Sequence, residues 1–278
     1  MTNKTMKYIS TTIIYVLLIS LAVFFLFPVL IGMLNSLKSR GEMLDNVLAL
    51  PIPPRWENYS YVINEVNILF HFKNNIIVTI IAVPGINILS SLAGYKLSRT
   101  PGKLSKFIFF MMWMSMLIPF HSIMFTIIRV TQTLGIKDLL MGLAFVYIGI
   151  GVNFAIFLYH GFTKNVPKEI EEAALIDGCN QLQSFVLVVF PLLMPITITI
   201  FIINVLWVWN DFFLPLVMIS KYANYTLVLV ASSFFSKYVT EWSYILPILT
   251  LSSLPMIVFY LVFQKYIVKG IADGALKG

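Results

Sequence analysis

Charged residues divide the chain into long apolar segments. A helix that crosses a membrane needs about 20 predominantly apolar residues, so each uncharged segment of this length predicts one span. Six segments meet this requirement: residues 8–34, 74–95, 107–128, 139–163, about 191–220 and 242–264. The pattern therefore predicts an all-α, polytopic membrane protein with six transmembrane helices.

The first of these segments resembles a signal peptide, because Lys4 and Lys7 precede it. Its apolar run is far longer than the ~7–15 residues of a signal h-region. The residues at its end, Gly32 to Ser36, do not resemble a cleavage site. We therefore interpret this segment as a retained first span.

The composition agrees with a membrane protein. Of the 278 residues, 59% are hydrophobic and 11% are charged, whereas soluble domains carry roughly 25% charged residues. The mean hydropathy of +0.89 excludes intrinsic disorder, which requires low hydrophobicity. The one cysteine, Cys179, excludes internal disulfides and cysteine-rich zinc sites.

The distribution of lysine and arginine predicts the topology, because short cytoplasmic loops are enriched in both. One set of segments carries basic residues with few acids: Lys4, Lys7, Lys96, Arg99, Lys103, Lys106, Lys265, Lys269 and Lys277. The opposite segments are mixed or sparse in charge, so we predict that both termini are cytoplasmic. The net charge of +7 then reflects topology, and no nucleic-acid partner is needed to explain it.

The domain organisation follows from these spans. Residues 1–69 are expected to form the first transmembrane helix and an outer loop, whose prolines at 51, 53 and 54 prevent a continuing helix. Residues 70–268 are expected to form a five-helix core with a cytoplasmic loop at about 164–190. Residues 269–278 are expected to form a cytoplasmic tail.

The loop at 164–190 begins with the signals of a short helix. Pro167 suits a first helical turn, where its missing N–H costs nothing. Glu169, Glu171 and Glu172 then place negative charge where the helix dipole favours it. The helix is expected to run to about Ile176.

A sharp turn and a second helix are expected to follow. Asp177-Gly178 stops the first helix, since glycine enters left-handed conformations without cost. Asn180 and Gln183 form a plausible capping pair for the second helix. Pro191 and Pro195 are expected to bound or kink it.

Residues in and around this loop resemble a known family. Glu172-Ala173-Ala174 and Asp177-Gly178, followed by Val188 and Pro191, resemble the EAA motif of ABC-importer permeases. Residues 93–103, 207–216 and 266–278 are similar to the carbohydrate-uptake, maltose-type subfamily, and specifically to the smaller of its two permease subunits. The resemblance covers most of the chain.

The resemblance implies a permease subunit that moves a sugar or a sugar derivative and is coupled through the EAA loop to a separate ATPase. The residues implied in coupling are Glu172, Ala173, Ala174, Asp177, Gly178 and Pro191. Small residues also permit close approach of a partner groove. The alternative is that the glutamates form a solvated face and that the alanines only reflect helix propensity.

The resemblance also implies partners. These are a second permease in a heterodimer, two ATP-binding subunits and an extracytoplasmic solute-binding protein, in the cytoplasmic (inner) membrane of a prokaryote. The chain contains no Gly-x-x-x-x-Gly-Lys-Ser/Thr, so ATP and Mg²⁺ are expected on the partner ATPase. We expect no cofactor and no catalytic site in this chain.

Polar side chains recur along the fifth apolar segment. Thr197, Asn204, Trp207 and Asp211 follow at steps of seven, three and four, which stack on one helical face. Our hypothesis is that they line a translocation path, because polar groups within a span are costly unless they face a cavity or another helix. The third segment has a similar stripe: Ser115, Pro119, Ser122, Thr126 and Arg129.

The alternative is that small and polar residues hold the helices together, and it is favoured for the second and fourth segments. The alternative function is a secondary transporter, which should show repeated halves and several ionisable residues near the bilayer centre. Only Asp211 is clearly within a predicted span. His71, His121 and His160 share neither a face nor a ligand spacing, so no metal site is expected.

Overall fold

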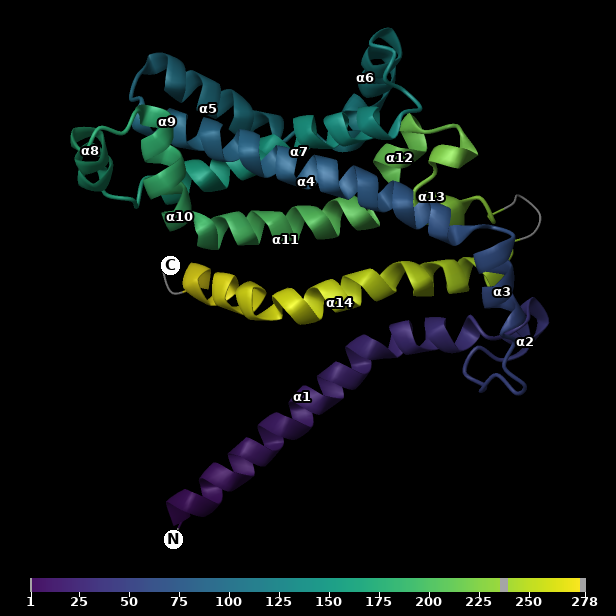
Figure 1. Cartoon of the computed structure of the whole chain (residues 1–278). Coiled ribbons are helices and arrows are strands. Elements are labelled where there is room, and N and C mark those ends of the chain that lie inside the picture. Colours follow the sequence, from purple (N-terminus) through teal and green to yellow (C-terminus); the bar gives the residue numbers. More distant parts are fainter. Residues whose placement is uncertain (1, 236–239, 276–278) are drawn as a thin grey trace. The chain divides into compact units, whose positions relative to one another are not determined.

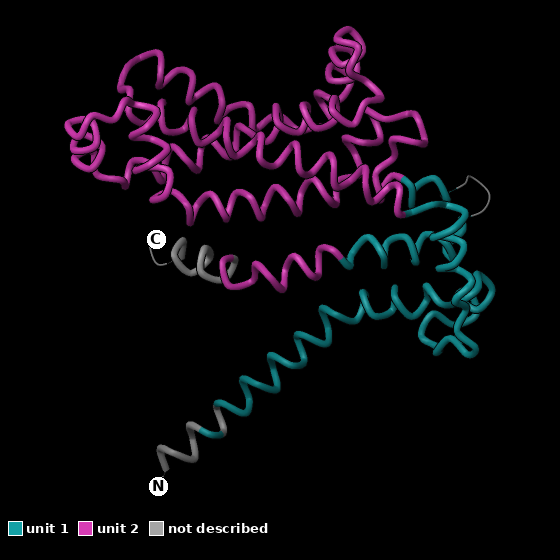
Figure 2. The backbone as a smooth tube through the Cα atoms, viewed as in Figure 1, with its two compact units in different colours: residues 1–68, 230–254 teal, residues 69–229, 255–278 magenta. Residues whose placement is uncertain are grey.

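The computed structural model describes residues 2–235 and 240–275, and within them every regular element is a helix, as predicted (Figure 1). The chain divides into two compact units, shown in separate colours in Figure 2. Unit 1 comprises Met1–Ile68 and Val230–Leu254, and unit 2 comprises Leu69–Leu229 and Pro255–Gly278.

Four single helices are long and apolar enough to cross a membrane. They are α1 (Thr2–Asn35), α4 (Ile68–Arg99), α7 (Leu140–Thr163) and α14 (Trp242–Ala275). Two bent helix pairs also qualify if each pair is counted as one span. The described residues then contain up to six spans. Five of them match the predicted apolar segments in position. The fifth span, the pair Gln181–Leu192 and Met194–Asn210, begins and ends about ten residues before the predicted segment 191–220, so its first part lies in the predicted loop at 164–190.

The third predicted segment is not a straight helix. It consists of α5 (Lys103–Ser115) and α6 (Phe120–Thr133), which meet at a bend of 105°. Pro119 stands directly before α6, where it lacks a backbone N–H and disfavours a helical conformation of Ile118, so it favours a break in the helix at this point. The predicted polar stripe from Ser115 to Arg129 is therefore divided between two helices.

The fifth segment is also bent, by 77°. Its first part comprises α9 (Gln181–Ser184), the π-helical turn η1 (Phe185–Val189) and α10 (Phe190–Leu192). Its second part is α11 (Met194–Asn210), which is followed by the short helix α12 (Phe213–Met218). Pro191 and Pro195 lie in the first turns of α10 and α11, so the prolines bound the bend as predicted.

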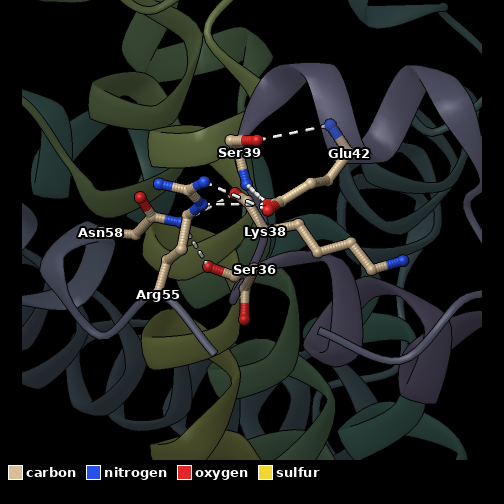
Figure 3. Close-up of polar contacts among 6 residues, drawn as sticks. All are labelled: Ser36, Lys38, Ser39, Glu42, Arg55 and Asn58. Carbon is tan, nitrogen blue, oxygen red and sulfur yellow. Dashed lines mark hydrogen bonds and ion pairs between the residues drawn. The ribbon is translucent and has the colours of Figure 1, made fainter. Parts of the chain in front are cut away.

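Unit 1 contains an ordered loop between α1 and α4. The loop holds α2 (Arg40–Asp45) and α3 (Glu57–Asn64). Figure 3 shows the polar contacts that join its parts. The buried Asn58 Nδ2 donates to the carbonyls of Ser36 and Lys38, both at 2.9 Å. Lys38 is 1% exposed, and its Nζ donates to the carbonyls of Asn46 and Val47.

The same loop carries an exposed ion pair. The Arg55 guanidinium donates to both carboxylate oxygens of Glu42, at 3.0 and 3.1 Å. Ser39 and Glu42 form a reciprocal capping box at the start of α2. The hydrogen bonds from Arg55 and from Ser39 lower the pKa of Glu42 to about 2.

Unit 2 is built around α4, α7 and α11, with α12 closing one end of the core. Its central apolar cluster includes Val83, Leu143, Tyr147, Val208 and Met218. Two further short helices, η2 (Tyr222–Asn224) and α13 (Leu227–Ser232), follow α12 in sequence. Asn75 connects distant segments, because its Nδ2 donates to the Trp209 carbonyl and its Oδ1 accepts from the Leu227 N–H, both at 3.0 Å.

The structure supports the packing interpretation of the second segment. A Cβ atom added at Gly94 would lie 2.7 Å from Tyr159 Cβ and 3.0 Å from His160 N, so α4 and α7 approach closely there. The Tyr159 hydroxyl also donates to Asn87 Oδ1 at 3.0 Å. Gly94 and Asn87 thus hold α4 against α7.

Candidate functional site

The predicted helix of the 164–190 loop is α8 (Lys168–Ile176). Pro167 stands at its N-cap, one residue before the helix, and the first turn contains Glu169 and Glu171. The side chains of Glu172, Ala173 and Asp177 are exposed, whereas Ala174 is buried. Ile176 is 86% exposed, which leaves a large apolar side chain free on the surface of this segment.

The predicted turn after α8 is confirmed by its geometry. Gly178 has a φ of +94°, a conformation that L side chains rarely adopt. The Cys179 N–H donates to the Ala174 carbonyl and the Gly178 N–H to the Leu175 carbonyl, which ends the helix. The exposed Asp177 is the C-cap residue.

The predicted capping pair of the second helix is confirmed. The Gln183 N–H donates to Asn180 Oδ1, and the Asn180 N–H donates to Gln183 Oε1, both at 2.9 Å. This box starts α9, and η1 and α10 continue from it toward α11. The 164–190 loop is therefore a helix, a tight turn and a second helical segment that leads into the bend at Leu193.

A buried polar cluster joins α8 to the end of α4, and it was not among the predicted site residues. Arg99 Nε donates to Glu171 Oε1 at 2.7 Å, and the Tyr95 hydroxyl donates to Glu171 Oε2 at 3.0 Å. Arg99 Nη2 also donates to the Val166 carbonyl at 2.7 Å. The Arg99 and Glu171 side chains are 12% and 10% exposed. We call these residues, Tyr95, Arg99, Val166 and Glu171, the α4–α8 cluster.

Two signals in the sequence point to the α4–α8 cluster. Glu171 stands directly before Glu172-Ala173-Ala174, and Tyr95 and Arg99 lie within the recognised 93–103 segment. Seventy-two residues separate Arg99 from Glu171, however, so no local pattern pairs them.

A cavity of about 470 Å³ lies between the α5–α6 bend, α7 and α11. Two of the four predicted path residues, Asn204 and Trp207, line it. Ser115, from the predicted stripe of the third segment, and Asn153 of α7 line it as well. Polar groups from three segments thus meet around one space, beside the Trp207 ring.

The other two predicted path residues have partners elsewhere. The Thr197 hydroxyl donates to the Leu193 carbonyl at 3.0 Å, and its oxygen lies 3.0 Å from the oxygen of the Tyr159 hydroxyl. Asp211 is not within a helix, because α11 ends at Asn210 and Asp211 adopts an extended conformation. Its carboxylate accepts from the Tyr147 hydroxyl at 2.8 Å and from two N–H groups at the start of α12.

The histidines have separate environments. His71 Nδ1 lies 2.9 Å from the Tyr225 carbonyl, His121 packs on Phe213, and His160 stacks on Phe109. Within the part of the chain that the structure describes, no group of three His, Cys, Asp or Glu side chains could hold a metal ion.

Comparison with known proteins identifies the family. Residues 86–273 match the family model of the binding-protein-dependent transport system inner membrane component. Over 261 residues, the chain is 36% identical to the probable starch degradation products transport system permease protein AmyC of Thermoanaerobacterium thermosulfurigenes. The alignment covers 93% of this chain and 94% of that relative.

Two further relatives are also permease proteins of sugar transport systems. The multiple sugar-binding transport system permease protein MsmG of Streptococcus mutans is 30% identical, over 95% of this chain and 96% of its own. The melibiose/raffinose/stachyose import permease protein MelC of Bacillus subtilis is 31% identical, over 90% and 91%.

The fold is that of a chain in the crystal structure of a bacterial ABC transporter involved in the import of the acidic polysaccharide alginate. The TM-score is 0.78, and the match covers 93% of this chain and 96% of that chain at 23% sequence identity. Together with the long apolar helices, the family match places the protein in the prokaryotic inner membrane as a multi-pass protein. The chain belongs to the inner-membrane permeases of binding-protein-dependent transport systems, in the branch whose relatives are sugar ABC-transporter permeases.

Proposed function

We propose that this chain is the permease subunit of an ATP-binding-cassette importer that moves a sugar or sugar derivative into the cell. Its partners in this proposal are a second permease, two ATP-binding subunits that bind ATP and Mg²⁺, and an extracytoplasmic solute-binding protein. The names of the relatives support the substrate class, because they refer to starch products, multiple sugars and melibiose-type oligosaccharides.

The observation that carries the coupling role is the two-sided character of α8. One side is anchored in this chain, because Glu171 is bound by Arg99 and Tyr95 of α4. The other side exposes Glu172, Ala173 and the largely uncovered Ile176. A short helix with small residues and an exposed apolar side chain suits a groove on another protein. We propose that the ATPase provides that groove.

The mechanism follows from these anchors. Closure of the ATPases on ATP would move α8, and the α4–α8 cluster would pass this movement to α4. The tight turn at Gly178 and the capping box at Asn180 would pass it to η1, α10 and the bend before α11. Such a movement biases the bundle between inward-facing and outward-facing states, because the ATPase prefers one of them.

The cavity beside Trp207 is our proposed part of the substrate path. An indole ring with amide and hydroxyl groups nearby offers apolar contact and hydrogen bonds to a hydroxylated solute. Substitution of Asn204 or Trp207 should lower transport without loss of assembly. If transport is unchanged, these residues only pack the helices.

The test compares two exposed apolar residues in the native complex, purified in mild detergent. Ile176→Asp alters the exposed side of α8, and Leu48→Asp is the matched control in the loop of unit 1, where Leu48 is 63% exposed. We expect the ATPase to be lost only from the Ile176 variant. Equal recovery from both variants would contradict the docking role of α8. Solute uptake by the chain in vesicles that lack ATP and the ATPase would instead favour a secondary transporter.

A further inference from the structure

A second cavity of about 470 Å³ lies where α4 ends, α5 begins and α7 ends. It is separate from the cavity beside Trp207, and none of the proposed path residues line it. Its rim is formed by Ser98 near the end of α4, by Thr100 to Gly102 of the α4–α5 connection, and by Lys164 after α7. The apolar runs of these helices give way to charged residues here, so the cavity lies at the boundary between hydrocarbon and water.

The rim of this cavity is cationic. Lys106 and Lys164 both line it, and both are exposed. Among the side chains that the structure describes, neither lysine has a carboxylate partner. Ser98 and Ser105 add hydroxyl groups to the same rim. An anion at this position would therefore meet two positive charges without competition from an acid.

The wall of the cavity is aromatic. Phe109 stacks on His160 with ring centroids 3.9 Å apart. The ring centroid of Phe157 lies 6.1 Å from that of Phe109. Phe110 and Trp113 continue the wall along α5 and are 48% and 42% exposed. This surface suits a hydrocarbon chain, and an indole near the membrane interface is typical of lipid contacts.

We propose that this cavity binds an anionic phospholipid of the bilayer. The phosphate lies between Lys106 and Lys164, and an acyl chain lies along Phe110 and Trp113. Charge complementarity selects an acidic headgroup, and the aromatic wall selects a lipid over a soluble anion. Basic pockets between transmembrane helices recognise acidic headgroups by this combination.

The first experiment uses the complete complex in nanodiscs that contain a phosphatidylglycerol and phosphatidylcholine mixture. Native mass spectrometry then counts the lipids that remain bound after release from the disc. Lys106→Gln with Lys164→Gln should reduce phosphatidylglycerol retention about 30-fold, or about fivefold for each lysine. The matched control is Lys96→Gln with Lys103→Gln, since neither residue lines the cavity.

The control distinguishes a site from general membrane attraction. Retention that falls equally in both double variants would overturn the proposal, because diffuse electrostatics would explain the binding. Equal retention of phosphatidylcholine and phosphatidylglycerol by the native protein would also overturn it. Displacement of the lipid by inorganic phosphate at millimolar concentration would identify a soluble-anion site instead.

A second experiment tests the aromatic wall. Phosphatidylglycerol with a diazirine in its acyl chain is photolysed in the same discs, and the labelled peptides are sequenced. We expect labelling of the peptide that contains Phe110 and Trp113, and its loss in the Lys106 and Lys164 double variant. If the double variant is labelled on this peptide as strongly as the native protein, the lysines and the aromatic wall do not bind the same lipid, and the proposal is wrong.

Discussion

The loop of unit 1 and the α4–α8 cluster of unit 2 both contain an arginine–glutamate pair, but their surroundings differ. The Arg55 and Glu42 side chains are 45% and 38% exposed, whereas those of Arg99 and Glu171 are 12% and 10% exposed. Water screens the first pair, so it contributes little to stability. The second pair is mostly desolvated, so removal of one member leaves a charge without compensation.

The number of hydrogen bonds that a pair makes does not measure how strongly the pair stabilises its surroundings. Arg55 bonds both carboxylate oxygens of Glu42, yet the buried Asn58 and Lys38 hold the loop more strongly because water cannot replace their bonds. In unit 2 the pair itself is the buried group. Four substitutions test this contrast.

The largest effect is expected for Glu171→Ala. The Arg99 guanidinium would stay buried without its carboxylate, which costs about 3–5 kcal/mol when a buried pair is broken. Thermal unfolding of the purified complex should occur at lower temperature, and ATP-driven uptake should fall strongly. Glu169→Ala is the control, since Glu169 is exposed in the same turn. If both substitutions lower the unfolding temperature and the uptake equally, the burial of Glu171 does not distinguish it from Glu169.

Gly178→Val should have the next largest effect on transport. A β-branched residue at a φ of +94° is strained, at a cost of about 1–2 kcal/mol, although no atom lies within 4 Å of its Cβ position. Gly178→Asn should cost less, because asparagine tolerates left-handed conformations better. The measurement is the number of solute molecules imported per ATP hydrolysed. A ratio that is the same for valine and asparagine would mean that the turn geometry is not needed for coupling.

Asn58→Ala should destabilise the loop of unit 1 locally. The substitution leaves the Ser36 and Lys38 carbonyls without their donor, at a cost of about 1–3 kcal/mol. Limited proteolysis should cut between residues 39 and 57 faster than in the native chain. Asn64→Ala serves as the exposed control, and similar cleavage of both variants would show that burial of Asn58 is unimportant.

The smallest effect is expected for Glu42→Gln, with only a slight fall in unfolding temperature at pH 7, because water screens the exposed pair. The folded pKa of Glu42, about 2, is below its ordinary value of 4.5. Its contribution is therefore complete above pH 4.5 and is lost as the pH falls through about 2. Hydrogen exchange of residues 37–58 should be the same at pH 7 and pH 5, after correction for intrinsic rates. A marked rise at pH 5 would mean that the Glu42–Arg55 pair is weaker than its contacts imply.

Elements within a few residues of each other were predictable from the sequence. The Asn180–Gln183 box and the turn at Gly178 have local signals, and the structure contains both. Five of the six apolar segments were also correct in position, whereas the fifth was predicted about ten residues too late in the chain. The shape of the third segment was not predicted, because the helix direction changes by 105° between Ser115 and Phe120.

The fate of Asp211 shows why helical periodicity has limits. The spacing to Trp207 placed both on one face, but this holds only while the helix continues. Tyr147, 64 residues earlier, donates to the Asp211 carboxylate, which also accepts from the start of α12. The helix therefore ends at Asn210, and Asp211 does not reach the cavity that Trp207 lines.

Four features were predictable from the amino-acid sequence alone: the class of protein, the number of apolar segments, the helix–turn–helix of the 164–190 loop and the family resemblance. These depend on composition and on residues close together in the chain. Three contacts were visible only in the folded chain: Arg99 binds Glu171, Asn204 and Trp207 share a cavity with Ser115 and Asn153, and Lys106 and Lys164 line one aromatic pocket. Such contacts depend on how helices pack, and helix packing is set by the summed fit of many side chains, which no single spacing encodes.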